Sequence, residues 1–76
     1  MRGGWRDNGG MQIQLNGQAL TLDTPLTITA LLEREGLGAR RVAVEVNGAI
    51  VPRGQHAAHA LADGDVVEIV HALGGG

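Results

Sequence analysis

The residues most able to take part in chemistry are the last three, Gly74, Gly75 and Gly76, which follow a run from Val66 to Leu73 that predicts a strand. They offer only backbone and an α-carboxylate, and glycine allows backbone to approach another surface closely. We interpret them as a thin, flexible arm that threads into a partner's active site and presents the carboxylate of Gly76 for chemistry. A frayed end or an expression scar is the alternative reading of the same three residues.

The other candidate groups favour structural roles. His56 and His59 are three residues apart but have no carboxylate or cysteine near them, so we expect a solvated loop rather than a metal site. His71 has no evident acid-base partner. The aspartates of Asp63-Gly64-Asp65 are typical of a turn, because aspartate bonds its own backbone and glycine supplies positive φ. We therefore expect no catalytic residue and no metal ligand.

The composition narrows the function further. The 76 residues include no cysteine and no lysine, so the chain has no disulfide, no thiol nucleophile and no amine for a Schiff base. The formal net charge of −2 gives no reason to expect nucleic acid as a partner. No apolar run is long enough for a membrane span, and no signal peptide is visible, so we expect a cytoplasmic protein. Because the sequence offers no nucleophile, no convincing acid-base pair, no metal site and no cofactor loop, we also expect that it is not an enzyme.

The pattern of the sequence starts at Met11. Residues 1–10 are rich in glycine and lack periodicity, and we expect a disordered leader or an expression-derived extension. Residues 11–73 then form one domain, and residues 74–76 form the tail. The alternation from Gln12 to Leu15 predicts a strand, Asn16-Gly17 predicts a type I′ hairpin turn, and residues 18–22 predict the return strand.

A helix and a second hairpin follow. Thr27 is a candidate N-cap, an apolar stripe follows it at helical spacing, and Gly36 ends the helix. Residues 41–46 and 49–51 predict two strands around the turn Asn47-Gly48, with a loop over residues 53–60 that has room for a helical turn. Leu61 to Asp65 predicts a turn before the final strand. This order predicts an α+β fold of the β-grasp type, with a mixed sheet of four to five strands and one main helix packed on one face.

The predicted core is entirely aliphatic, because the only aromatic residue, Trp5, lies in the leader. The predicted core residues are Ile13, Leu15, Leu20, Leu22, Ile28, Leu31, Leu32, Val42, Val44, Ile50, Leu61, Val67 and Ile69. The final strand is also apolar on its outer face, where only Glu68 is charged. We interpret Val66, Val70, Ala72 and Leu73 as a docking surface for the partner that processes the tail, with ordinary surface residues as the alternative.

Several segments resemble one family when they are taken together and in order. From Met11 to Gly76 the chain is similar to the sulfur carrier proteins of thiamine biosynthesis, which are small ubiquitin-like β-grasp proteins. The matching segments are Met11–Gly17, Thr29–Leu32, Val42–Arg53, Leu61–Val70 and the final glycines. The resemblance also implies that the last strand lies beside the first in the centre of the sheet.

The resemblance implies a mechanism and a set of partners. An E1-like adenylyltransferase would use ATP to convert the carboxylate of Gly76 to an acyl-adenylate. A cysteine desulfurase or related donor would then supply persulfide sulfur, which leaves a thiocarboxylate, and thiazole synthase would take that sulfur. The carrier itself would bind no cofactor, because ATP is used by the partner enzyme.

Three alternatives stay open on the sequence. The chain could carry sulfur for another pathway, such as molybdopterin synthesis, tRNA thiolation or cysteine synthesis, although residues 42–53 favour thiamine. It could be a non-catalytic β-grasp binding module, of the kind found in longer RNA-linked proteins. It could be conjugated to other proteins as ubiquitin is, but chains through its own lysines are excluded because it has none.

Overall fold

The computed structural model describes residues 10–71, which form five strands, one α-helix and one short 3-10 helix. In chain order the elements are β1 (Met11–Leu15), β2 (Gln18–Leu22), α1 (Ile28–Arg34), β3 (Val42–Val46), β4 (Ala49–Val51), η2 (Arg53–Gln55) and β5 (Val66–His71). This is the order predicted from the sequence, and η2 is the helical turn allowed for in the loop over residues 53–60.

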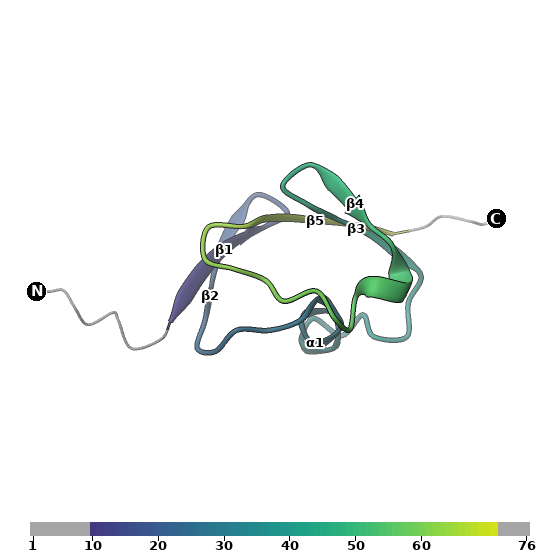
Figure 1. Ribbon diagram of the computed structural model, residues 1–76, viewed down its shortest axis with the longest axis horizontal. Coiled ribbons are helices and arrows are strands. Elements are labelled where there is room, and N and C mark those ends of the chain that lie inside the picture. The colour runs from purple at the N-terminus through teal and green to yellow at the C-terminus, as the bar shows by residue number, and fades with distance from the viewer. Residues whose placement is uncertain (1–9, 72–76) are drawn as a thin grey trace, which may run out of the picture.

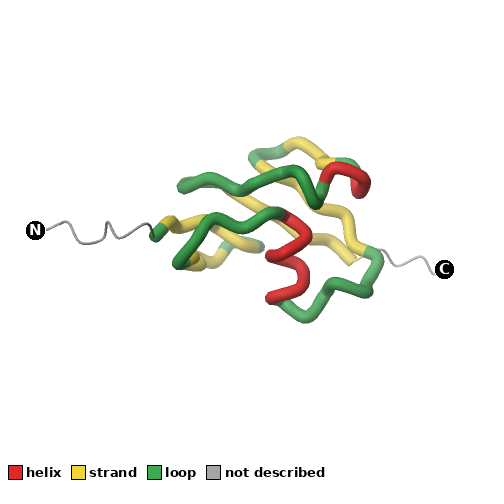
Figure 2. The backbone as a smooth tube through the Cα atoms, turned by 60° about the horizontal axis from the view of Figure 1, so that its bottom comes forward, coloured by secondary structure: helices red, strands yellow, loops and turns green. Residues whose placement is uncertain are grey.

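The five strands form one mixed sheet in the order β2-β1-β5-β3-β4 (Figure 1). The last strand, β5, lies in the centre, parallel to β1 and antiparallel to β3. The helix α1 and the long loops lie on one face of the sheet and leave the other face open (Figure 2). This is the β-grasp arrangement, and it confirms the predicted fold class and the central position of β5.

Both predicted hairpin turns are present. Asn16 and Gly17 have φ values of 51° and 86°, and Asn47 and Gly48 have φ values of 54° and 87°. Positive φ at both central residues defines the type I′ turn, whose twist suits a two-residue hairpin. Asparagine and glycine tolerate this conformation better than other residues, which is why the sequence predicted both turns.

The two turn asparagines also hold the central strand. The Oδ1 atom of Asn16 accepts a hydrogen bond from the backbone N–H of Ile69 at 2.8 Å. The Oδ1 atom of Asn47 accepts one from the N–H of Val66 at 2.9 Å. Because these bonds come from the two hairpins on either side, β5 is fixed laterally at two points along its length.

Local signals also set the ends of α1. The hydroxyl of Thr27 accepts a hydrogen bond from the N–H of Ala30 at 3.1 Å and caps the N-terminus. At the other end Gly36 has a φ of 78°, and the N–H of Leu37 donates to the carbonyl of Leu32 at 2.7 Å. This is a Schellman ending, and it turns Leu37 back against the core.

The core lies between α1 and the covered face of the sheet. The buried residues are Ile13, Leu22, Ile28, Leu31, Leu32, Val44, Val46, Val51, Leu61, Val67 and Ile69. Leu15, Leu20 and Val42 are partly buried and pack against them. Most of the predicted core is therefore confirmed, and its stability comes from aliphatic burial at about 1.5–3 kcal/mol per fully buried side chain.

One predicted core residue was wrong. Ile50 is 60% exposed, whereas its neighbour Val51 is buried. The register explains the difference, because Val51 lies opposite the buried Val44 and Ile50 lies opposite Glu45. Residues that face each other across a strand pair point to the same side of the sheet, so Ile50 belongs to the open face.

Candidate functional site

The far end of β5 precedes the predicted tail in the sequence. His71, the last described residue, lies opposite Val42 at the start of β3. The end of β5 therefore lies beside the first residue of β3, at the end of the sheet opposite to the start of β1 (Figure 1). The predicted docking residues Ala72 and Leu73, and the tail residues 74–76, lie outside the described residues.

The open face of the sheet carries an aliphatic patch. Val66 is 38% exposed and Val70 is 56% exposed, so both predicted docking residues in the described range point outward as expected. Val70 lies opposite Ala43, yet more than half of its surface stays accessible to solvent. Ile50 extends the patch onto β4, and we call Ile50, Val66 and Val70 the outer patch. An antiparallel sheet covered on one side normally has a polar open face, so this composition is typical of a contact surface.

Two carboxylates lie within the outer patch. Glu45 of β3 and Glu68 of β5 are direct cross-strand partners on the open face. Like charges in that position destabilise a sheet slightly. The outer patch is thus an aliphatic surface with two carboxylates at its centre. It suits a partner surface on which a basic side chain is surrounded by apolar side chains.

The paired aspartates before β5 are structural, as predicted. Gly64 between them has a φ of 88°. The Asp63 carboxylate accepts a hydrogen bond from the N–H of Gln12 at 2.7 Å, and the Asp65 carboxylate accepts one from the N–H of Ala62 at 2.8 Å. These bonds fix a turn and tie it to β1, and the two carboxylates do not converge on a common site.

His56 overturns the prediction of a solvated loop at its position. The side chain is only 6% exposed, and its Nε2 atom lies 3.0 Å from the carbonyl oxygen of Val51. A carbonyl only accepts, so Nε2 carries the proton and donates. The backbone carbonyl of His56 also accepts from the N–H of Thr29 at 3.2 Å. His56 therefore joins β4, η2 and the first turn of α1, which is a structural role.

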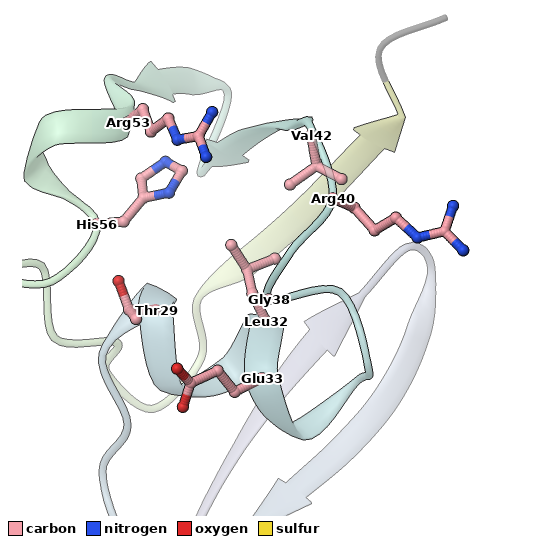
Figure 3. Close-up of a pocket in the computed structure, with 8 residues that line it drawn as sticks. All are labelled: Thr29, Leu32, Glu33, Gly38, Arg40, Val42, Arg53 and His56. Carbon is pink, nitrogen blue, oxygen red and sulfur yellow. The ribbon is translucent and has the colours of Figure 1, made fainter.

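A hollow of about 210 Å³ lies between α1, the start of β3 and η2 (Figure 3). Its lining residues are Thr29, Leu32, Glu33, Gly38, Arg40, Val42, Arg53 and His56. Leu32 and Val42 form its apolar part, and Figure 3 shows the Arg53 guanidinium on the same side as His56, with the Glu33 carboxylate on the opposite side. Within residues 10–71 no group of three or more side chains is arranged to hold a metal ion.

A family comparison decides what kind of chain this is. The model of the ThiS family matches residues 11–76, a range that covers every strand and helix described above and continues to the last glycine. The chain belongs to the ThiS family. This membership confirms the resemblance found in the sequence. The match begins at Met11, which is also where the alternating pattern of the sequence begins.

Similar proteins of known name agree with this family. The sulfur carrier protein ThiS of Escherichia coli K12 is 36% identical over 66 residues, which is 87% of this chain and 100% of the relative. The thiazole synthase of Paramagnetospirillum magneticum is 42% identical over 66 residues, and that of Magnetococcus marinus is 41% identical. The chain spans only 20% of the length of each of these two synthases.

A solved structure supports the same fold. The crystal structure of the thiamine biosynthesis protein ThiS from Geobacter metallireducens superposes with a TM-score of 0.76 at 36% identity, over 87% of this chain and 100% of that one. In the part of this ThiS-family chain that the structure describes, no helix has the length and apolar character needed to cross a membrane.

Sequence reasoning missed one group of residues near the end of β5. Arg40 and Arg53 line the same hollow although they lie on different segments, and Arg41 directly precedes the residue opposite His71. The adjacent basic residues Arg40 and Arg41 could have been noticed in the sequence. Their position near the end of β5 follows from the pairing of β3 with β5, which local sequence patterns do not reveal.

Proposed function

We propose that this chain is a sulfur carrier for the thiazole ring of thiamine, and that it carries the sulfur as a thiocarboxylate on Gly76. The observation that supports this most is the ThiS family match, which extends through Gly76. The second support is the relation to the Escherichia coli sulfur carrier, which covers the whole of that protein. In this role the chain is a substrate of other enzymes and not a catalyst.

The chemistry starts from a carboxylate that is a poor electrophile. The Gly76 carboxylate attacks the α-phosphorus of ATP on an E1-like adenylyltransferase, and pyrophosphate leaves as the acyl-adenylate forms. Magnesium and positive charge for this step come from the enzyme. The outer sulfur of a persulfide then attacks the acyl carbon and AMP leaves. A thiol reduces the resulting sulfur–sulfur bond, which frees the thiocarboxylate.

The composition of the chain suits this sequence of steps. There is no cysteine to capture the activated end within the same molecule. Residues 72–76 span at most about 17 Å when extended. That reach allows Gly76 to enter a buried site while the folded body remains outside, with Gly74 and Gly75 in the narrowest part of the entrance.

The folded body has a separate task, which is to bind the enzymes that use the tail. We propose that Val66 and Val70 of the outer patch, together with Ala72 and Leu73, contact the E1-like adenylyltransferase. In the sequence these residues directly precede the tail, so a protein that binds them also has Gly76 within reach. The exposure of 56% at Val70 is the structural support for this contact.

We propose three partners for this carrier: the E1-like adenylyltransferase, a cysteine desulfurase or related sulfur donor, and thiazole synthase. Two relatives named thiazole synthase contain a segment similar to this chain, which supports the last of these. The proposed carrier binds no cofactor of its own, acts in the cytoplasm, and needs neither a membrane nor a nucleic acid.

The test is ATP–pyrophosphate exchange by the adenylyltransferase. The expected result is exchange that depends on the carrier, and a shortened chain without Gly75 and Gly76 should support none. Thermal unfolding of both chains should coincide, because the deletion leaves the described sheet, helix and core unchanged. Equal exchange with the shortened chain would contradict activation at Gly76.

A further inference from the structure

Basic side chains gather where β5 ends. Arg40 and Arg41 directly precede Val42, which lies opposite His71. Arg53 belongs to η2 and lines the same hollow as Arg40. Three of the six arginines of the sequence therefore lie on segments close to the end of β5. We call Arg40, Arg41 and Arg53 the basic collar.

The collar is not neutralised by the rest of the fold. All three arginines are exposed, and within residues 10–71 no side-chain hydrogen bond or ion pair involves them. Glu33 lines the same hollow, but its carboxylate lies on the side of Thr29, across the hollow from the Arg53 guanidinium (Figure 3). Five N–H donors on each guanidinium are thus available to an outside acceptor.

The acids lie mainly elsewhere. Asp63 and Asp65 come just before β5, at the end of the strand opposite to the collar, and their carboxylates bind the N–H groups of Gln12 and Ala62. The whole chain has a formal net charge of −2 in spite of this basic end. Such a separation of charge orients an approaching partner, since complementary potentials steer association.

We infer that the basic collar binds an acidic segment of the enzyme that activates the tail, and that one carboxylate of that segment enters the hollow beside Arg53. This inference rests on the proposed function, because it needs an enzyme that receives the tail. The lining of the hollow suits an entering carboxylate side chain. The guanidinium of Arg53 can bind the carboxylate in a bidentate manner, and Leu32 and Val42 can pack against the aliphatic part of the same side chain.

A protein carboxylate fits the position of the collar better than a nucleotide phosphate does. The phosphates of ATP must meet the carboxylate of Gly76, which lies five residues beyond His71. The collar lies at the base of that segment, where the entrance of an enzyme site would face it. The collar therefore acts in recognition of the carrier and leaves the chemical step unchanged.

The experiment uses the full chain with its adenylyltransferase and follows ATP–pyrophosphate exchange against carrier concentration. The variants are Arg53→Glu and Arg40→Glu, and the control is Arg34→Glu, which makes the same change of charge in the last turn of α1 but outside the hollow. We expect KM for the carrier to rise at least about tenfold for Arg53→Glu and Arg40→Glu, with kcat unchanged, and less than about twofold for the control.

Two further measurements identify the contact. Arg53→Lys keeps the charge but loses the bidentate geometry, so its KM should lie between those of the wild type and Arg53→Glu. Added salt should raise KM for the wild type more steeply than for Arg53→Glu. Salt screens the attraction between Arg53 and the partner's carboxylate, and the variant lacks that attraction.

The outcomes separate this inference from the proposed function. Exchange by the wild type together with equal KM values for Arg53→Glu and Arg34→Glu would overturn the collar while leaving the carrier role intact. A fall in kcat at constant KM would also overturn it, since the arginine would then act in the chemical step. No exchange by the wild type, with an enzyme active on another carrier, would overturn the proposed function and the collar with it.

Discussion

Replacing Val70 with aspartate should separate partner binding from folding. Val70 is 56% exposed and lies on the open face near the end of β5, so its side chain contributes little to the core. Val67, three residues earlier, is 0% exposed and serves as the buried counterpart. Thr21 of β2 is also exposed, lies opposite Gln12 away from the outer patch, and is the matched surface control.

The size of the binding effect follows from the exposed fraction. Full burial of a valine side chain is worth about 1.5–3 kcal/mol, so burial of the exposed 56% in a complex is worth about 0.8–1.7 kcal/mol. That energy corresponds to a factor of about 4–17 in affinity. The new carboxylate would also be desolvated two residues from Glu68, which adds to the loss. We therefore expect KM of Val70→Asp in ATP–pyrophosphate exchange to rise at least about tenfold.

The effect on stability should be small. Strand propensities span about 1 kcal/mol, and for a domain of this size that changes Tm by about 4–8 °C. Thr21→Asp should lower Tm by a similar amount and leave KM unchanged. Val67→Asp should leave the chain largely unfolded, because the total stability of about 3–9 kcal/mol for the 62 described residues is too small to offset the burial of a charge.

Two results would refute this reasoning about the outer patch. Loss of the folded state in Val70→Asp, as expected for Val67→Asp, would show that Val70 belongs to the core. A KM equal to that of the wild type, with the fold intact, would show that the adenylyltransferase binds another surface.

Three other changes test separate parts of the account. Gly75→Val should abolish adenylation without changing Tm, because the added side chain obstructs a narrow entrance; normal ATP–pyrophosphate exchange would rule out threading. Asn47→Ala should lower the free energy of unfolding by about 1–3 kcal/mol, since the N–H of Val66 loses its acceptor and the turn loses a residue that tolerates positive φ; urea unfolding that matches the wild type would contradict this. His56→Leu should cost about 1–3 kcal/mol because the carbonyl of Val51 loses its donor, and an unchanged urea midpoint would mean that the bond is not a net contributor.

The sequence predicted those parts of the fold that depend on local chemistry. Both Asn-Gly turns, the Thr27 cap and the Gly36 ending each arise from a few neighbouring residues, and all four are present. The side of the sheet on which Ile50 lies was also available from the sequence. A two-residue turn at 47–48 fixes Ile50 opposite Glu45, and hydrophobicity alone was the wrong criterion for it.

The rest depended on contacts between segments far apart in the chain. His56 is buried because η2 packs between β4 and α1, and no pattern around position 56 states that packing. The basic collar exists because β3 lies beside β5 and η2 lies beside the start of β3. A cluster of side chains that is formed by the order of the strands can be recognised only when that order is known.

The sulfur-carrier role is best tested by the intact mass of the chain after incubation with the adenylyltransferase, ATP, cysteine and a desulfurase. We predict an increase equal to the exchange of one oxygen for one sulfur, which fragmentation locates on Gly76. An unchanged mass, under conditions in which the same enzymes convert another carrier, would contradict the sulfur-carrier role.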